Sequence, residues 1–347
     1  MWIDQEIIKR DLDALMGLDL ELSAFDGKRV LITGGTGMIG SNLANALLYY
    51  GLGRENPPIV KLLVRNPEKA RRQFASQLAL CPNLRLLLGD VTSPRLPETR
   101  VDYIIHAAGQ TASRKMVEQP VETILTTVDG TRNMLELCRK KGAKMVYLSS
   151  MEVYGSQPRG KRVTEEDVGA LLPTSLRSSY PLSKQLAECL CAGYASEYKV
   201  DVKMVRLTQT MGPGVHREDR RVCAMIARCA KEGKDVVLNT TGASSRSYLY
   251  TMDAVSAILT VLLKGIPGEA YTAANEETYC SIAKMAQTVL DELGNGESKV
   301  VFDLKDENVY FDISYLDLDT SKLRTLGWSP RYGLTEMYRN MMETMEE

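Results

Sequence analysis

A tyrosine, a lysine and a serine in two short segments have the types and spacing of a proton-transfer set. Tyr180 and Lys184 stand four residues apart in the segment YPLSK, and Ser150 lies upstream in the segment LSSMEVYG. Residues four apart on a helix share one face, so the phenol and the ammonium are expected side by side. Because a cation favours the phenolate, we expect the pKa of Tyr180 to lie below its usual value of about 10. With Ser150 on the same substrate oxygen, this set predicts hydride chemistry on an alcohol or a ketone.

A glycine-rich segment nearer the N-terminus, TGGTGMIG at residues 33–40, indicates the partner for that chemistry. It follows an apolar run and opens a predicted helix. Gly34, Gly37 and Gly40 suit a tight turn, a close approach of the backbone to a pyrophosphate and close packing of the helix on the strand. The unpaired N–H groups of the helix would then face the phosphates. The segment therefore predicts a bound dinucleotide, NAD or NADP, whose nicotinamide adds positive charge near the phenol and whose ribose Lys184 would hydrogen-bond.

The end of the second predicted strand bears on the choice of dinucleotide. An acidic residue usually binds the adenosine ribose 2′-OH at this point, but the chain has Arg65 with no nearby aspartate. An arginine can pair with a 2′-phosphate and stack on adenine, so Arg65 favours NADP over NAD, unless it is only a solvated charge. Asp90 would flank the adenine or cap the following turn. The predicted cofactor-binding residues are Gly34, Thr36, Gly37, Met38, Ile39, Gly40, Arg65, Asn66, Asp90, Val91, Ala107, Ala108, Gly109, Tyr180 and Lys184.

These residues need a scaffold that brings the ends of several strands together. Apolar runs alternate with longer amphipathic segments from about residue 28 to residue 207, which predicts a Rossmann-type, doubly wound parallel sheet of the α/β class. The predicted strands are 29–33, 59–64, 84–88, 101–106, 144–149 and 202–207, and the predicted helices are 39–50, 66–80, 121–141 and 180–198. After residue 210 the alternation loosens, with helices expected over 222–231, 253–263 and 281–293 and a short strand over 235–239.

This pattern divides the chain into three parts. We expect an N-terminal helical extension over residues 1–26, an NAD(P)-binding domain over 27–210, and a smaller α/β substrate-binding region over 211–347. Segments near 236–265 are expected to return to the first domain.

Composition narrows the function classes for this chain of 347 residues. A net charge of -1 gives no reason to expect nucleic acid or a membrane surface as a partner, and no apolar run is long enough to span a bilayer. Seven cysteines without a CxxC pair indicate reduced thiols, and the acidic N-terminus does not resemble a signal peptide, so a cytoplasmic location is expected. Only two histidines are present, which disfavours a histidine-based triad or metal site. We interpret His106 as a packing residue at a strand end.

Taken together, the motifs resemble those of the extended short-chain dehydrogenase/reductases of the nucleotide-sugar epimerase/dehydratase family. The resemblance runs in the family's order from about residue 28 to residue 332. Its carriers are TGGTGMIG from Thr33, HAAG from His106, DGTRNMLELC from Asp129, LSSMEVYG from Leu148, YPLSK from Tyr180, RLTQTMGPG from Arg206, SRSYLYTMD from Ser245, YTAAN from Tyr271 and LGWSP from Leu326.

The resemblance implies a nucleotide-sugar substrate, a tightly held NAD(P) and a homodimer active in carbohydrate or polysaccharide biosynthesis. The sugar C4 hydroxyl would be oxidised to a ketone, rearranged and reduced again. Arg246 would contact the substrate diphosphate, and Gln209 stands where the family usually has an asparagine that does so. Thr127 likewise replaces a usual asparagine.

The position of Glu152 decides which rearrangement follows the oxidation. Dehydratases of this family often carry Asp-Glu after the hydroxyl residue, and here the Asp position is Met151, which cannot transfer a proton. The resemblance extends to UDP-glucuronate decarboxylase-like members, which place a glutamate where Glu152 stands. We therefore expect epimerisation or decarboxylation, with Glu152 as a catalytic residue or else as a structural partner. The alternatives are a 4,6-dehydratase, a net NADPH-dependent ketoreductase and a non-catalytic dinucleotide sensor.

Overall fold

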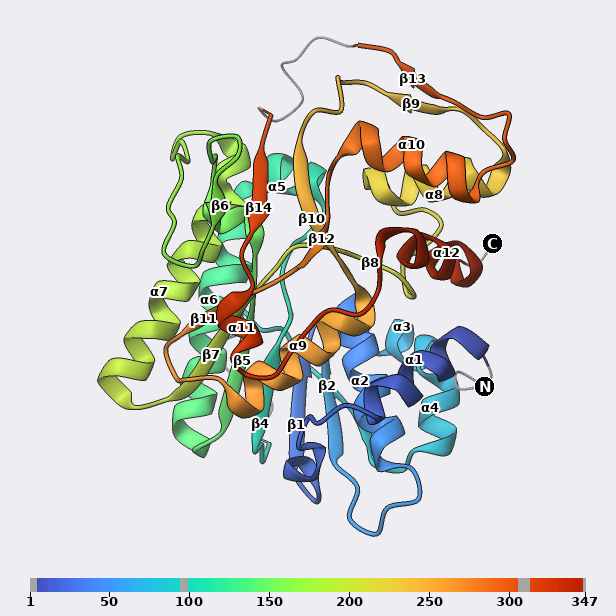
Figure 1. Cartoon of the computed structure of the whole chain (residues 1–347). Helices are drawn as coiled ribbons and strands as arrows, with labels where there is room; N and C mark the ends of the chain where they lie inside the picture. Colours follow the sequence, from blue (N-terminus) through green and yellow to red (C-terminus); the bar gives the residue numbers. More distant parts are fainter. Residues whose placement is uncertain (1–4, 94–98, 305–312, 346–347) are drawn as a thin grey trace.

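The computed structural model describes residues 5–93, 99–304 and 313–345, and a seven-stranded parallel sheet lies at its centre (Figure 1). Every neighbouring pair of strands in this sheet is parallel. The strand order changes direction between β1 and β4, and open α/β sheets bind their ligands beyond the strand ends at such a point. From one edge the order is β3 (Leu84–Leu88), β2 (Ile59–Val64), β1 (Arg29–Thr33), β4 (Tyr103–His106), β5 (Lys144–Ser150), β7 (Asp201–Leu207) and β11 (Ala270–Ala273).

Helices cover both faces of this sheet because its strands are apolar on both sides. In β1, Val30 and Ile32 pack into one core and Leu31 packs into the other. One face is covered by α2 (Met38–Gly51) and α9 (Thr251–Lys264), and the other by α6 (Pro120–Lys141) and α7 (Ser179–Tyr198). The long α6 has a proline in its first turn and ends at Gly142, whose φ of 64° suits a glycine. The predicted fold class is confirmed.

A smaller region lies beyond the carboxyl ends of the strands, at the top of Figure 1. Its centre is β10 (Ser245–Tyr250), which pairs with β8 (Gln209–Met211), β12 (Asn275–Ser281) and β14 (Tyr315–Leu318). The short β6 (Arg162–Val163) pairs with β14. The helices of this region are α8 (Val222–Glu232), α10 (Ile282–Leu293) and α12 (Leu334–Thr344).

The N-terminal extension forms a helix, α1 (Glu6–Met16), that packs on α2 and α9. Its buried Asp11 accepts hydrogen bonds from the hydroxyls of Tyr250 and Tyr332, which belong to the C-terminal half of the chain. The extension is therefore fastened to the rest of the molecule by buried polar contacts. Residues 1–4 of the predicted extension lie outside the described residues.

Two local expectations differ from the structure. The helix predicted over 66–80 is two helices, α3 (Pro67–Gln73) and α4 (Ala75–Leu80), which are separated by the buried Phe74. The strand predicted over 235–239 is β9 (Val236–Leu238), and it pairs with β13 (Val300–Phe302) rather than with the main sheet. Of the segments expected to return near 236–265, α9 does lie on the main sheet, and β11 after it forms the sheet edge. Sequence periodicity predicts an element's type but not its partner, which explains the misplacement of β9.

Candidate functional site

The glycine-rich loop joins β1 to α2 in a conformation that excludes other side chains at two positions. Gly34 has a φ of +68°, and a Cβ there would lie 2.7 Å from the carbonyl oxygen of Ala107. A Cβ on Gly40 would collide with the carbonyl oxygen of Gly34. Gly37 is the N-cap of α2 and offers no side chain to the N–H groups of the first turn, where Met38 and Ile39 lie half-buried. This bare helix N-terminus fits the diphosphate of NAD(P).

Gly35, which the sequence analysis did not single out, is also restricted. A Cβ on Gly35 would lie 2.9 Å from a side-chain carbon of Leu62 on β2. Thr36 follows it and is half-buried. The turn therefore packs tightly on the neighbouring strand as well as on its own helix.

The end of β4 is held against the end of β1 by a buried histidine. Nδ1 of His106 lies 2.7 Å from the Thr33 hydroxyl oxygen, which also accepts a hydrogen bond from the N–H of Ala108. Burial, with the charge of Lys184, lowers the pKa of His106 to about 3, so the ring is neutral. The contact positions Ala107, Ala108 and Gly109 beside the glycine loop, where a dinucleotide would pass, and it agrees with the interpretation of His106 as a packing residue.

The predicted proton-transfer residues meet at the ends of β5 and the start of α7. Lys184 Nζ donates a 2.7 Å hydrogen bond to the carbonyl oxygen of Leu148 and lies 5.8 Å from the ring centre of Tyr180. The Ser150 hydroxyl lies close enough to the phenol of Tyr180 to act on its pKa. A Cβ on Gly109 would lie 3.8 Å from Lys184 Nζ, so the lysine also faces the predicted path of the cofactor. The structure thus brings together residues from β4, β5 and α7.

Burial dominates the acid–base properties of this group. Burial raises the pKa of Tyr180 above its ordinary value, and the charge of Glu152 raises it further, while Ser150 and Arg177 act in the lowering direction. Burial lowers the pKa of Lys184 to about 8, against the opposing effect of Glu188. In the protein alone, desolvation of the phenol therefore dominates and raises its pKa, whereas the prediction of a lowered pKa concerns Lys184 acting together with a bound nicotinamide. The charge of a bound nicotinamide would act to lower it.

Glu152 lies beside this group and is paired. It belongs to the short helix η3 (Met151–Tyr154), and its backbone N–H donates to the Ser150 hydroxyl oxygen at 3.2 Å. Nη2 of Arg177 lies 2.8 Å from one carboxylate oxygen of Glu152 and 2.7 Å from the other. Sequence reasoning missed Arg177, and its only signal there was its place three residues before Tyr180.

Met151 stands at the position where dehydratases of this family often carry an acid. It is buried in a small apolar cluster with Tyr154 and Leu316, and its sulfur accepts a hydrogen bond from Thr208. Ser149 is also buried, and its hydroxyl has no hydrogen-bond partner among the described residues. Ser150 and Glu152 are therefore the polar side chains of this segment that stay near Tyr180.

The predicted adenosine end lies at the ends of β2 and β3. Arg65 is 78% exposed in its side chain and lies 3.9 Å from the carboxylate of Asp90. Asp90 accepts hydrogen bonds from the backbone and hydroxyl of Thr92, so it does cap the following turn. The Asn66 side chain caps α3 through the N–H of Lys69. The buried Val91 packs on α6 at Gly130, where a Cβ would lie 2.9 Å from a Val91 methyl group.

The predicted substrate residues lie on paired strands of the smaller region. Gln209 on β8 pairs with Tyr248 on β10, two residues from Arg246. Arg246 is half-buried and donates weakly to Ser314 at 3.5 Å. Its Nε is buried and has no hydrogen-bond partner among the described residues, as expected of a cation that is completed by an anionic ligand. The amide of Gln209 reaches Cys223 at the start of α8, at 3.8 Å.

Two other motif residues of the resemblance have structural contacts. The guanidinium of Arg206 donates hydrogen bonds of 2.8 to 3.2 Å to both carboxylate oxygens of Glu188. It also donates to the carbonyl oxygen of Glu165. Thr127 donates its hydroxyl to the carbonyl oxygen of Thr123 within α6. Neither side chain points to a ligand role.

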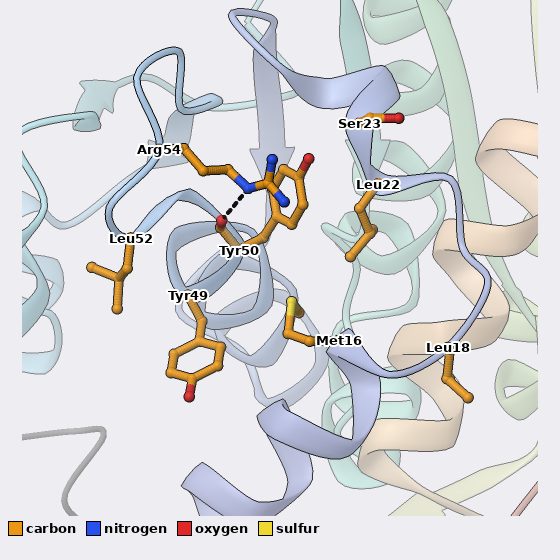
Figure 2. A pocket seen from close by; sticks show the side chains of 8 residues that line it. All are labelled: Met16, Leu18, Leu22, Ser23, Tyr49, Tyr50, Leu52 and Arg54. Atoms are coloured by element: carbon orange, nitrogen blue, oxygen red, sulfur yellow. Dashed lines mark hydrogen bonds between the residues drawn. The ribbon is translucent and has the colours of Figure 1, made fainter.

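A cavity of about 490 Å³ lies elsewhere, between α1, the short helix η2 (Leu22–Phe25) and the C-terminal end of α2 (Figure 2). Arg54 lies over the ring of Tyr50 there, 3.9 Å from its centre, and donates to its carbonyl oxygen. Because α2 runs antiparallel to β1, this cavity is at the opposite end of the sheet from the glycine loop and is not part of the candidate site.

No cluster of three or more histidine, cysteine, aspartate or glutamate side chains is placed to hold a metal ion within residues 5–93, 99–304 and 313–345. Over the same ranges, no helix combines the length and the apolar character that crossing a membrane requires.

Comparison with known proteins agrees with this geometry. UDP-glucuronic acid decarboxylase 6 of Arabidopsis thaliana is 30% identical over 310 residues, which is 89% of this chain and 86% of that protein. UDP-glucuronic acid decarboxylase 1 of Xenopus tropicalis is 29% identical over 91% of this chain and 71% of its own length. The solved dTDP-glucose 4,6-dehydratase DesIV of Streptomyces venezuelae, which holds NAD, is 27% identical, with a TM-score of 0.72 over 90% of this chain and 96% of that one.

A family model also matches the chain. The model described as the NAD dependent epimerase/dehydratase family matches residues 30–274, which include the glycine loop, Ser150, Tyr180, Lys184 and Arg246. The chain therefore belongs to the NAD dependent epimerase/dehydratase family and is an enzyme of that class.

Proposed function

We propose that the protein decarboxylates a nucleoside-diphosphate sugar acid, with UDP-glucuronate as the first substrate to test. The observation that carries the choice of reaction is Met151. Its side chain is buried among apolar residues, so no acid is present at the position that a standard 4,6-dehydration uses. The names of the similar decarboxylases support loss of CO2 over simple epimerisation. Met151 thus argues against dehydration, while the relatives favour decarboxylation over epimerisation and indicate the substrate class.

The chain's own residues would handle the C4 oxygen. Tyr180 takes the proton of the C4 hydroxyl as the ketone forms and returns it at the end, while Ser150 hydrogen-bonds the same oxygen. Lys184, held by the Leu148 carbonyl and facing Gly109, orients the nicotinamide ribose. When bound, NAD(P) supplies a hydride acceptor that gives the hydride back, so the net reaction needs no added oxidant.

Decarboxylation follows from the position of the ketone. A C4 ketone is β to the carboxylate on C5, so the electrons of the breaking carbon–carbon bond pass to the ketone oxygen as CO2 leaves. C5 then takes a proton from water, and the C4 ketone is reduced as Tyr180 returns its proton to the C4 oxygen. Tyr180 and Ser150 stabilise the developing negative charge on that oxygen. This sequence needs no base at C5, and because it expels no water it also needs no acid at the position of Met151.

The remaining roles belong to residues that would bind the substrate diphosphate and the adenosine ribose of the cofactor. Arg246, with its buried Nε, would pair with the substrate diphosphate, with Gln209 on the neighbouring strand. Arg65, exposed at the end of β2, would pair with a 2′-phosphate and favour NADP, although Asp90 competes for its charge at 3.9 Å. A homodimer in the cytoplasm remains our expectation for the assembly and the location.

The test is incubation of the purified protein with UDP-, dTDP-, GDP- and CDP-sugars, including uronates, with products read by mass spectrometry and NMR. The proposal predicts loss of CO2 from a uronate without added cofactor. Loss of water would indicate a dehydratase, and an unchanged mass with inverted stereochemistry would indicate an epimerase. A net requirement for NADPH would indicate a ketoreductase, and no turnover of any sugar would favour a sensor.

A further inference from the structure

Arg177 occupies a junction between the two segments that carry the proton-transfer residues. It lies in the short helix η4 (Leu176–Ser178), which leads directly into α7, three residues before Tyr180. Its partner Glu152 lies on η3, two residues after Ser150. The ion pair between them joins segments 25 residues apart in sequence. This ion pair therefore connects the segment that carries Ser150 with the segment that carries Tyr180. Both of these residues must act on the same substrate oxygen.

The pair is well shielded from solvent. The side chains of Arg177 and Glu152 are 15% and 29% exposed, and both carboxylate oxygens lie within 2.8 Å of the same guanidinium nitrogen. Such charge-assisted contacts are stronger than exposed ion pairs, and removing one partner leaves a poorly solvated charge. Loss of Arg177 would therefore release a carboxylate beside Ser150, to which Glu152 is also bonded through its backbone N–H.

The charges of this pair act in opposite directions on the phenol. The carboxylate of Glu152 raises the pKa of Tyr180, and the guanidinium of Arg177 lowers it. The other groups facing Tyr180 are the Ser150 hydroxyl, Lys184 beside its ring and Tyr147, whose buried phenol interacts with it. Glu152 and Arg177 are thus the two charged groups that act on Tyr180 from outside α7 and β5, and their effects on its pKa oppose each other.

We propose that Arg177 is a positioning residue that holds Glu152 and offsets its negative charge next to Tyr180, so that the phenol can give up its proton during the reaction. The inference rests on the proposed function for the reaction it serves. Its physical content, a charge balance around Tyr180, does not depend on which sugar is the substrate.

The test uses four variants, Arg177→Gln, Glu152→Gln, the double variant and Arg177→Lys, with Arg114→Gln as a control. Arg114 makes an exposed ion pair with Glu118 on the nearby α5 (Ser113–Glu118). The measurement is an ultraviolet difference titration of Tyr180 in NAD-loaded protein, with each variant compared with its own Tyr180→Phe counterpart. This readout needs no substrate, so it is independent of the decarboxylase proposal.

The variants are expected to change the pKa of Tyr180 in different ways. Arg177→Gln raises the pKa of Tyr180 by about one unit, which corresponds to about tenfold less phenolate at neutral pH. Glu152→Gln in the same chain reverses that rise, and both Arg177→Lys and Arg114→Gln stay near the wild type. If a uronate is turned over, the alkaline shift is also seen in the pH profile of kcat, with less change in KM.

Three results would overturn the inference. They are an unshifted phenol in Arg177→Gln, a shift that the second substitution does not reverse, and an Arg177→Lys variant that behaves like Arg177→Gln. If Arg177→Gln does not fold, the double variant and Arg177→Lys still give the comparison, because neither leaves the carboxylate unpaired. A loss of melting temperature without a shifted titration would assign the pair a structural role only.

Discussion

The proposed cofactor end and the proposed sugar end of this site are constructed in different ways. The cofactor end depends on one contiguous loop, in which Gly34 and Gly40 leave room only for backbone. The sugar end is assembled from separate segments that contribute Glu152, Arg177 and Arg246. At the first end the constraint is steric and local, whereas at the second it is electrostatic and depends on tertiary structure. A substitution at the cofactor end should therefore act mainly through steric clashes. A substitution at the sugar end should instead change the pH dependence of activity.

Two ion pairs next to α7 show the same contrast. Arg206 of β7 forks onto Glu188, and both side chains are at most 14% exposed. Burial by itself lowers the pKa of Arg206, but Glu188 reverses this and raises it. That pair fixes α7 on the sheet, whereas the Arg177–Glu152 pair is more exposed and lies beside the phenol. Similar chemistry thus fixes α7 on the sheet in one place and, in our proposal, balances charge just before its first turn in the other.

The largest effect is expected at the residue where the two ends meet. Tyr180→Phe keeps the packing of the ring and removes the proton-transfer group, so turnover should fall on the order of 10²-fold or more. Tyr198→Phe, at the exposed end of the same helix, is the control and should keep its activity. Steady-state kinetics on the true substrate measure both. Near wild-type turnover in Tyr180→Phe would remove the assigned role.

The steric character of the cofactor end is tested with two glycines of matched backbone conformation. Gly34 and Gly27 have φ values of 68° and 67°, but only at Gly34 would an added Cβ meet other atoms, within 2.8 Å of the backbone of Ala107 and Ala108. Both alanine variants carry a strain of about 1–2 kcal/mol. Gly34→Ala should additionally lose NAD(P) affinity, measured by calorimetry. Equal affinity in the two variants would contradict a tightly packed loop.

Cofactor preference is expected to change by a smaller amount. Arg65→Gln should weaken NADP binding by about 1–3 kcal/mol and leave NAD binding nearly unchanged, because only NADP carries the 2′-phosphate. Arg71→Gln on α3, which removes another exposed arginine, is the control. Titration of cofactor-free protein with both dinucleotides gives the answer. Equal affinities in the wild type would mean that Arg65 is a strand-end charge paired with Asp90.

The buried His106 predicts a modest acid dependence of stability. Its pKa of about 3 in the folded protein lies below the ordinary 6.5, so the unfolded chain binds the extra proton. Stability should therefore fall as pH drops from about 6.5 towards 3, by up to about 1.4 kcal/mol per pH unit. Asp253, whose pKa burial raises to about 6, acts in the opposite direction between 3.8 and 6, so the comparison must be between variants.

Urea unfolding of wild type and His106→Asn at pH 7 and pH 5 makes that comparison. The variant loses the contact with Thr33 and should be less stable at pH 7, but it should lose less stability on acidification. Because Asp253 is present in both proteins, its contribution cancels. If the free energy of unfolding fell by the same amount in both proteins between pH 7 and pH 5, the fold would not be keeping the histidine neutral.

The same contrast explains what could be predicted from the sequence. The glycine loop was recognisable because its steric demands fall on neighbouring residues, and Tyr180 and Lys184 because helical spacing places them on one face. Arg177 was missed because its partner is distant in sequence and a single arginine has no periodic signal. The raised pKa of Tyr180 depends on burial, and the pairing of β9 with β13 depends on packing between distant segments. Neither could be inferred from local pattern.

The central claim is that one bound dinucleotide oxidises and then re-reduces C4 of a sugar acid while CO2 is lost in between. The most direct measurement uses UDP-glucuronate deuterated at C4, incubated with the protein without added cofactor and read by NMR and mass spectrometry. The account predicts a product that has lost CO2 and still carries deuterium at C4, over many turnovers. A product that keeps its carboxylate, or that has lost CO2 but carries hydrogen at C4, would contradict it.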